Sequence, residues 1–141
     1  AFEAHAASTG ATRLRDALQA IRIAPLDCRA HVGVSVGPLG RKPGGTTVWV
    51  VTHVDVVPPR KDDGLAALAE LAETGRGAPG NLRFEVVQQI NRPNHFTVIE
   101  IWEDAAALED HTTAEATRRF RDALGPMSGA LYDERLFTEL G

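Results

Sequence analysis

Residues 96–124 read FTVIEIWEDAAALEDHTTAEATRRFRDAL, and this stretch decides the fold. Its first part alternates and is rich in β-branched and aromatic residues, which predicts a strand that ends near Trp102. An alanine-rich helical segment follows and carries His111 and the pair Arg118–Arg119. The stretch therefore predicts a strand that leads directly into a helix.

Half of this unit occurs a second time at the start of the chain. Residues 1–18 align with residues 107–124 without a gap, at a constant offset of 106 positions, and eight positions are identical. Shared helix propensity does not explain so many identities, so we interpret the chain as a repeat of one module with an incomplete first copy. The identical residues of that copy are Ala1, Glu3, His5, Arg13, Arg15, Asp16, Ala17 and Leu18.

The composition is typical of a globular protein. Of 141 residues, 43% are hydrophobic and 24% are charged, and the formal net charge is −4. We expect no nucleic-acid partner, because the arginines are spread among acidic residues, and no membrane contact, because no apolar run reaches roughly 18 residues. The single cysteine, Cys28, predicts a buried thiol in a reducing, cytoplasmic compartment. The first residue is not Met, so we expect a processed or partial chain.

Turn residues divide the chain into predicted elements. Residues 1–23 form an amphipathic helical pattern that ends at Pro25, and residues 28–36 alternate as a strand does. The glycine- and proline-rich residues 37–47 predict a linker. Beyond it we expect a strand at 48–57, a helix at 64–74, strands at 81–89 and 95–102, a helix at 105–124 and a strand at 132–140.

The order of these elements defines an α+β, ferredoxin-like module, βαββαβ. We expect a partial repeat over residues 1–36, a linker over 37–47 and a complete domain over 48–141. The two helices of the domain should cover one face of a four-stranded antiparallel sheet. Because strands 48–57 and 95–102 are apolar on both faces, we expect a second sheet, from another chain or another repeat, on the other face.

A pattern around the strand 95–102 resembles that of a known family. It consists of Gln89, Pro93, Asn94, Phe96, Glu100, Trp102, Glu103 and Asp104, followed by residues 107–111. In this pattern the chain is similar to the antibiotic biosynthesis monooxygenase (ABM) family. The resemblance implies a dimeric α/β barrel, formed sheet to sheet by a homodimer or by two repeats of one chain. It also implies oxidation of aromatic phenols or quinols by dioxygen, without a metal, flavin or haem.

The resemblance further implies an apolar pocket between the sheet and its helices. We expect its catalytic candidates to be His53, His111 and Trp102. Trp102 could be a pocket wall or a core anchor, and His111 a proton-transfer group or a structural histidine. His53 could accept a phenolic proton with Asp55 or a neighbouring group orienting it. The expected substrate-binding residues are Trp102, Phe84, Leu108 and Arg121.

Two functions remain open at this point. The first is a cofactor-independent monooxygenase that oxidises a small aromatic phenol or quinol, with dioxygen as co-substrate and no metal. The alternative is a non-catalytic ligand-binding or assembly module that kept the barrel. Haem degradation is not expected, because His53, His111 and Arg121 occupy the positions at which haem-degrading members carry Asn, Trp and His. An apolar cavity beside Trp102 would favour a ligand.

Overall fold

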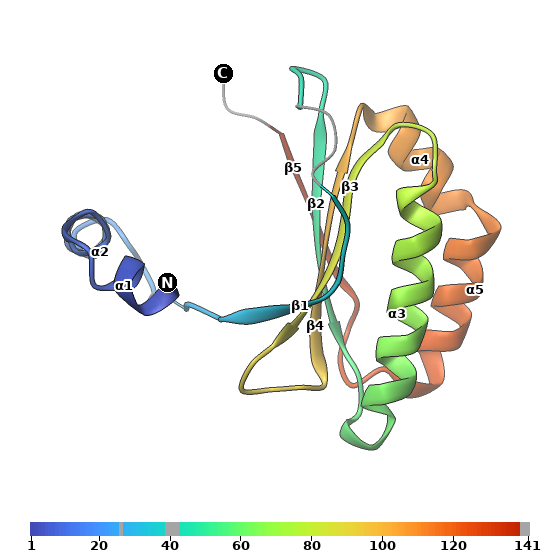
Figure 1. The fold of residues 1–141 in the computed structure, drawn as a ribbon, viewed down its shortest axis with the longest axis horizontal. Coiled ribbons are helices and arrows are strands. Elements are labelled where there is room, and N and C mark those ends of the chain that lie inside the picture. The colour runs from blue at the N-terminus through green and yellow to red at the C-terminus, as the bar shows by residue number, and fades with distance from the viewer. Residues whose placement is uncertain (26, 39–42, 139–141) are drawn as a thin grey trace.

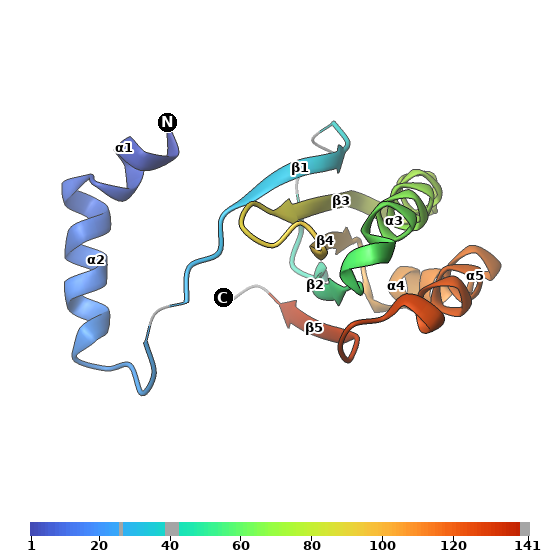
Figure 2. The same ribbon diagram turned by 90° about the horizontal axis from the view of Figure 1, so that it is seen from below.

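A computed structural model describes residues 1–25, 27–38 and 43–138 as a five-stranded antiparallel sheet with helices on one face. A helical arm extends beyond the other face (Figures 1 and 2). The elements are α1 (Phe2–Ala6), α2 (Thr9–Gln19), β1 (His31–Val36), β2 (Val48–Asp55), η1 (Pro58–Arg60), α3 (Lys61–Arg76), β3 (Asn81–Gln89), β4 (His95–Trp102), α4 (Ala105–Thr113), α5 (Glu115–Leu124), η2 (Gly125–Met127) and β5 (Asp133–Thr138). The α+β ferredoxin-like class is confirmed.

The sheet has the strand order β1-β3-β4-β2-β5. The last four strands of this order form the expected four-stranded module, and α3, α4 and α5 cover one of its faces (Figure 2). The fifth strand, β1, comes from the N-terminal arm and pairs with β3, from His31 opposite Gln89 to Val36 opposite Glu85. The sheet is therefore one strand wider than expected. The division into a partial repeat, a linker and a domain stays a prediction, and linker residues 39–42 lie outside the described residues.

Both predicted long helices are interrupted. Residues 105–124 form α4 and α5, because Ala114 between them is extended, with φ −62° and ψ 150°. Thr113 donates its hydroxyl to the carbonyl of Glu109, an interaction that competes with helix continuation. In the arm, Ser8 separates α1 from α2 and caps α2 by accepting from the Ala11 amide. The single helices expected at 1–23 and 105–124 were therefore wrong in this detail.

The two faces of the sheet differ in what covers them. Side chains at even positions of β2 and β4 point to the helices and form the main core. Side chains at odd positions point to the face without helices, which we call the open face; Trp49 and Ile99 there are half-buried. The sheet is thus apolar on both faces, as expected. The largest fully buried core residues are Trp102, Phe84, Phe96, Leu68, Val50, Val54, Val56, Val86 and Val98.

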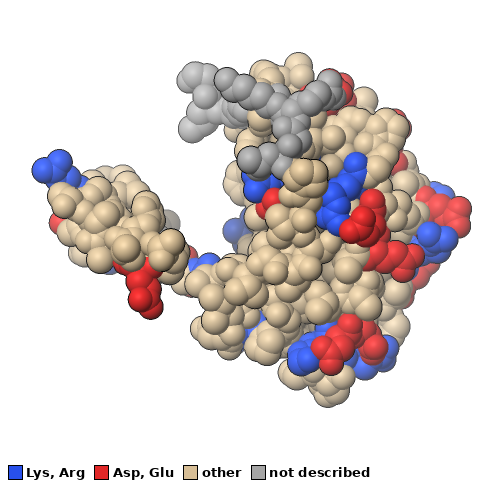
Figure 3. Space-filling model, in the orientation of Figure 1, with Lys and Arg blue, Asp and Glu red and all other residues tan. Residues whose placement is uncertain are grey.

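The surface carries charges of both signs. On the face in Figure 3 basic and acidic side chains lie next to each other. At the start of α3, Arg60 pairs with Asp63 and Lys61 with Asp62. The sole cysteine, Cys28, is exposed, so the expectation of a buried thiol was wrong; it lies in the extended arm, which has no core around it. Within the described residues, no helix has the length and apolar character that a membrane span requires.

The close packing of α3 against β3 predicts that a larger residue at Gly75 destabilises the fold. A Cβ atom at this position would lie closer than 3.0 Å to the ring of Phe84. We expect Gly75→Ala to lower the free energy of unfolding by about 1–3 kcal/mol, although Ala favours helices by about 1 kcal/mol over Gly. Gly77→Ala is the control, because its Cβ would meet only ordinary contacts. Urea denaturation measures both, and equal stability of the two variants would contradict the packing described.

Candidate functional site

The candidate site is built around a carboxyl group buried under the helices. Glu100 and Trp102 lie two residues apart on β4, so both point to the helix-covered face. Asp104 caps α4 by accepting a hydrogen bond from the Ala107 amide at 2.9 Å. Only two residues therefore separate the end of β4 from the start of α4. His111 then lies over the same strand. The cap therefore positions the imidazole above the carboxyl and the indole.

These three side chains are in direct contact. The indole Nε1 of Trp102 donates a hydrogen bond to Glu100 Oε2 at 2.8 Å, and His111 Nε2 lies 3.8 Å from the same oxygen. The imidazole stacks on the indole at 4.6 Å between ring centroids, and the Phe84 ring meets its edge at 5.5 Å. All are buried, Glu100 with 5% of its surface exposed. The Glu100 carboxyl is therefore almost shielded from solvent, and aromatic side chains surround it.

Burial controls the protonation of the site. Desolvation raises the pKa of Glu100 from 4.5 to about 7, which the hydrogen bond from Trp102 partly opposes. Desolvation lowers the pKa of His111 from 6.5 to about 4, and the charge of Arg121 acts in the same direction. Partial burial, followed by the charges of Glu134 and Glu100, raises the pKa of Tyr132 to about 12, although 37% of its surface is exposed. Near neutral pH the site therefore combines a half-ionised carboxyl with a neutral imidazole and a neutral phenol.

Two threonines complete the polar groups. Thr117 donates its hydroxyl to the His111 carbonyl at 2.7 Å, so its oxygen is left to accept from His111 Nε2, at 3.5 Å. The hydroxyl of Thr52 on β2 is fully buried. Tyr132 lies next to it, and a hydrogen bond between the two side chains lowers the pKa of Tyr132 against the larger effect of burial.

An open cavity of about 210 Å³ lies between the end of α5 and the start of β5; Glu100, Trp102 and His111 are not among its lining residues, so it is not the apolar cavity expected beside Trp102. Arg121 lies at its mouth and is held by a hydrogen bond from its Nη1 to the Thr112 carbonyl at 3.2 Å. The arginine charge lowers the pKa values of Glu100, His111 and Tyr132. The cavity is lined by Arg121, Leu124, Gly125, Ser128 and Tyr132.

The pKa of Glu100 predicts how stability depends on pH. Because its pKa is higher in the folded protein, its contribution to stability is complete below pH 4.5 and is lost as the pH rises to about 7. His111, with a lowered pKa, contributes above pH 6.5 and loses this as the pH falls to about 4. Glu100→Gln removes only the first effect. Relative to the parent, its free energy of unfolding should rise by about 3 kcal/mol between pH 4.5 and 7.

Denaturation at a series of pH values measures this difference. His111→Gln provides the opposite case, because its difference from the parent should change between pH 6.5 and 4. If the difference between Glu100→Gln and the parent did not depend on pH, Glu100 would not be the buried acid described here.

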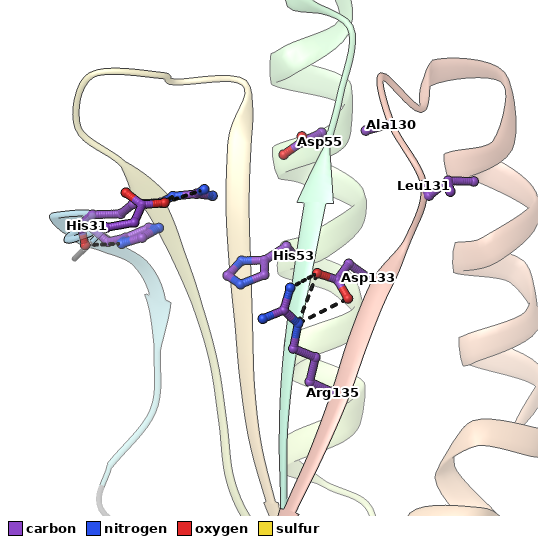
Figure 4. A pocket seen from close by; sticks show the side chains of 9 residues that line it. His31, His53, Asp55, Ala130, Leu131, Asp133 and Arg135 are labelled. Carbon is purple, nitrogen blue, oxygen red and sulfur yellow. Dashed lines mark hydrogen bonds and ion pairs between the residues drawn. The ribbon is translucent and has the colours of Figure 1, made fainter. Parts of the chain in front are cut away.

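A second cavity, of about 930 Å³, lies on the open face between β1 and β5 (Figure 4). His53 lines it and bonds through Nδ1 to the Thr97 hydroxyl at 3.1 Å, and His31 Nε2 meets the same hydroxyl at 3.2 Å. Asp55 does not orient His53; it pairs with His95 at 2.6 Å. The sheet thus separates His53 from the buried carboxyl.

The structure therefore brings together most of the residues singled out from the sequence. Trp102, His111 and Phe84 lie together around Glu100, and Leu108 belongs to the adjoining core. Arg121 is exposed on α5 and bonds the Thr112 carbonyl, and it acts on His111 only through its charge. Of the predicted set, His53 lies on the other face. Sequence reasoning missed Glu100, Thr117 and Tyr132 as members of the site. A charged residue on the buried face of a strand, two positions before Trp102, was the available signal.

The fold and this arrangement define a ferredoxin-like α+β module with a polar site enclosed between its sheet and its helices. Residues 47–123 match the family described as antibiotic biosynthesis monooxygenase. Since the match covers more than half of the chain, the chain belongs to this family. The resemblance inferred from the sequence is confirmed.

Individual relatives agree with this assignment. The protein named "Putative monooxygenase YcnE" of Bacillus subtilis is 25% identical over 59 residues, which span 42% of this chain and 62% of that relative. A "Putative monooxygenase" of Fusobacterium nucleatum has a similar structure, with a TM-score of 0.83 at 15% identity over 99% of this chain and 67% of that one. A crystal structure of an antibiotic biosynthesis monooxygenase has a TM-score of 0.64 at 26% identity. The match covers 67% of this chain and 99% of that one. The chain thus matches less than two thirds of the length of the Bacillus subtilis relative, and the likeness to the Fusobacterium nucleatum structure shows a shared fold.

Proposed function

We propose that the module is a cofactor-independent monooxygenase that oxidises a small aromatic phenol or quinol with dioxygen. The observation that carries this proposal is the buried Glu100, whose pKa of about 7 suits a general base at neutral pH. Its carboxylate would take the proton of a phenol that enters from the side of the cavity lined by Arg121 and Tyr132. A phenolate is electron-rich enough to reduce dioxygen without a bound metal or flavin.

The reaction balances without an external reductant. A quinol and dioxygen give a hydroxyquinone and water: one oxygen atom enters the ring in place of a hydrogen, and the other leaves as water. The protein contributes the removal of the phenolic proton and the exclusion of water. Arg121 supplies a positive charge near the phenolate, and the indole of Trp102 keeps the Glu100 carboxylate in place. His111 stays neutral and lies over the indole.

Oxygen uptake with a panel of benzene and naphthalene diols tests the proposal. We expect turnover that depends on a diol, yields the hydroxyquinone and needs no added metal or flavin. His111→Ala should lower it, because the stacked ring that holds Trp102 is lost. His53→Ala should leave it unchanged, because His53 lies on the open face. Absence of turnover with every diol, with no change in Trp102 fluorescence on adding them, would favour a non-catalytic module instead.

A further inference from the structure

The N-terminal arm presents helices that have nothing to cover. Neither α1 nor α2 has a buried residue, and Phe2 and Leu14 are 60% and 61% exposed. The arm is attached to the rest of the molecule through β1 and stands off from the open face (Figure 2). An amphipathic helix pair with its apolar side in water is incomplete as a structural unit.

The geometry of the arm repeats that of α4 and α5. The break between α1 and α2 is at Ser8, with φ −66° and ψ 153°, and the break 106 positions later is at Ala114, with φ −62° and ψ 150°. Across the first break, Arg15 donates from Nη1 to the Ala6 carbonyl at 2.8 Å. Across the second, Arg121 donates from Nη1 to the Thr112 carbonyl at 3.2 Å, again 106 positions later.

The same offset continues into the strands that follow. Asp27 and Arg29 form an ion pair at the start of the arm's extended segment, at 2.7 Å. Asp133 and Arg135 form the matching pair on β5 at 2.6 Å. All four residues line the open-face cavity, and Figure 4 shows Asp133 and Arg135 of the second pair on β5. Helices, break, arginine bond and ion pair therefore recur in the same order.

The arm and the α4–α5 pair differ in how deeply their apolar side chains are buried. Leu108 and Phe120 are 9% and 5% exposed, because α4 and α5 cover the sheet. Their counterparts in the arm, Phe2 and Leu14, face solvent. The side that the arm presents is thus the side that, in α4 and α5, covers β4 and its neighbours. From this correspondence we infer that a partner of the arm would have to offer the apolar face of a sheet.

The arrangement leaves a place for such a sheet. β1 and β5 are the two edge strands, and each has only one neighbour within the described residues. The arm stands opposite the open face, across the space between these edges (Figures 1 and 2). The similar structure from Fusobacterium nucleatum matches 99% of this chain, arm included, and a third of that chain lies beyond the match.

We propose that the arm is the helical half of a second site, with His5 and Arg15 at the positions of His111 and Arg121. Its partner is a three-stranded sheet with a helix, equivalent to β2-α3-β3-β4, whose central strand carries a Glu-x-Trp sequence. The activity of this second site rests on the proposed function, whereas its assembly does not.

The second site differs from the first at several positions. Thr117, which bonds His111, corresponds to Ala11, which has no hydroxyl. Tyr132 corresponds in sequence to Leu26, which lies outside the described residues. Gly125 and Ser128, which line the cavity at the end of α5, correspond to Gln19 and Arg22. The second site therefore exchanges hydroxyl groups for the longer polar side chains of Gln19 and Arg22.

Fusion of a copy of residues 47–106 directly before Ala1 tests the assembly. The fusion gives the arm the same preceding elements that residue 107 has in the module. We expect amide hydrogen exchange in α2 to become at least about 100-fold slower than in the 141-residue chain. The ring protons of His5 should show NOE contacts to the indole of the added copy of Trp102. Neither measurement depends on turnover, so failure here and failure of the proposed function are distinguishable.

Point variants make the test specific. Leu14→Ser in the fusion should reverse the slower exchange, and Arg13→Ser should not, because its counterpart Arg119 is exposed. In the unfused chain, Leu14→Ser should leave the unfolding midpoint of the module unchanged. If α2 exchanges at the same rate with and without the added segment, or if that segment stays unfolded beside the arm, the proposal is overturned.

Discussion

Glu100→Gln is expected to lower kcat/KM for quinol oxidation by about 10²–10⁴-fold, the range found when a general base is removed. Glutamine has the same shape and still accepts from the Trp102 indole, so the site should stay assembled. In the parent protein kcat/KM should rise as the pH passes about 7, where the carboxyl ionises. This rise should be absent from the residual activity of the variant.

Glu85→Gln is the matched control for this result. Glu85 is also a buried glutamate, 7% exposed, but it lies on the open face and pairs with Arg83 at 2.8 Å. We expect its kcat/KM and pH profile to match those of the parent. If Glu100→Gln kept its activity to within a few-fold, the base would have to be another group.

Trp102→Ala should have the largest effect on stability, with a loss of about 3–5 kcal/mol. The side chain is fully buried in the core, and its removal also takes away the indole donor from Glu100. Trp49→Ala is the control, because Trp49 is a half-buried tryptophan on the open face of β2. Urea denaturation at pH 7 measures both. A loss at Trp102 no larger than that at Trp49 would contradict the central place of Trp102 in the core.

Much of the fold could be predicted from local patterns. Residues 96–124 contain a strand, a cap and a helix, and each follows from alternation, from Asp104 and from spacing of apolar residues. The interruption at Ala114 could not be predicted in this way, because helix propensity there is high. The place of β1 was missed because the pairing of β1 with β3 joins residues 49 to 58 positions apart.

The site could be predicted only in part, for a similar reason. The sequence shows that His53 shares a face with Trp49, but only the register, with Val48 opposite Trp102, shows that this face is not that of Trp102. The pKa of Glu100 depends on burial by distant elements, which no local pattern contains. Tyr132 reaches the site because β5 lies beside β2.

The most direct test of Glu100 as the base is an NMR titration of the carboxyl carbons of isotope-labelled glutamates in the folded protein. The signal that disappears in Glu100→Gln identifies the residue. We predict that this signal titrates at about pH 7, clearly above the ordinary glutamate value of 4.5. A Glu100 signal that titrates near pH 4.5 would show a solvated carboxylate and would contradict its role as a buried base.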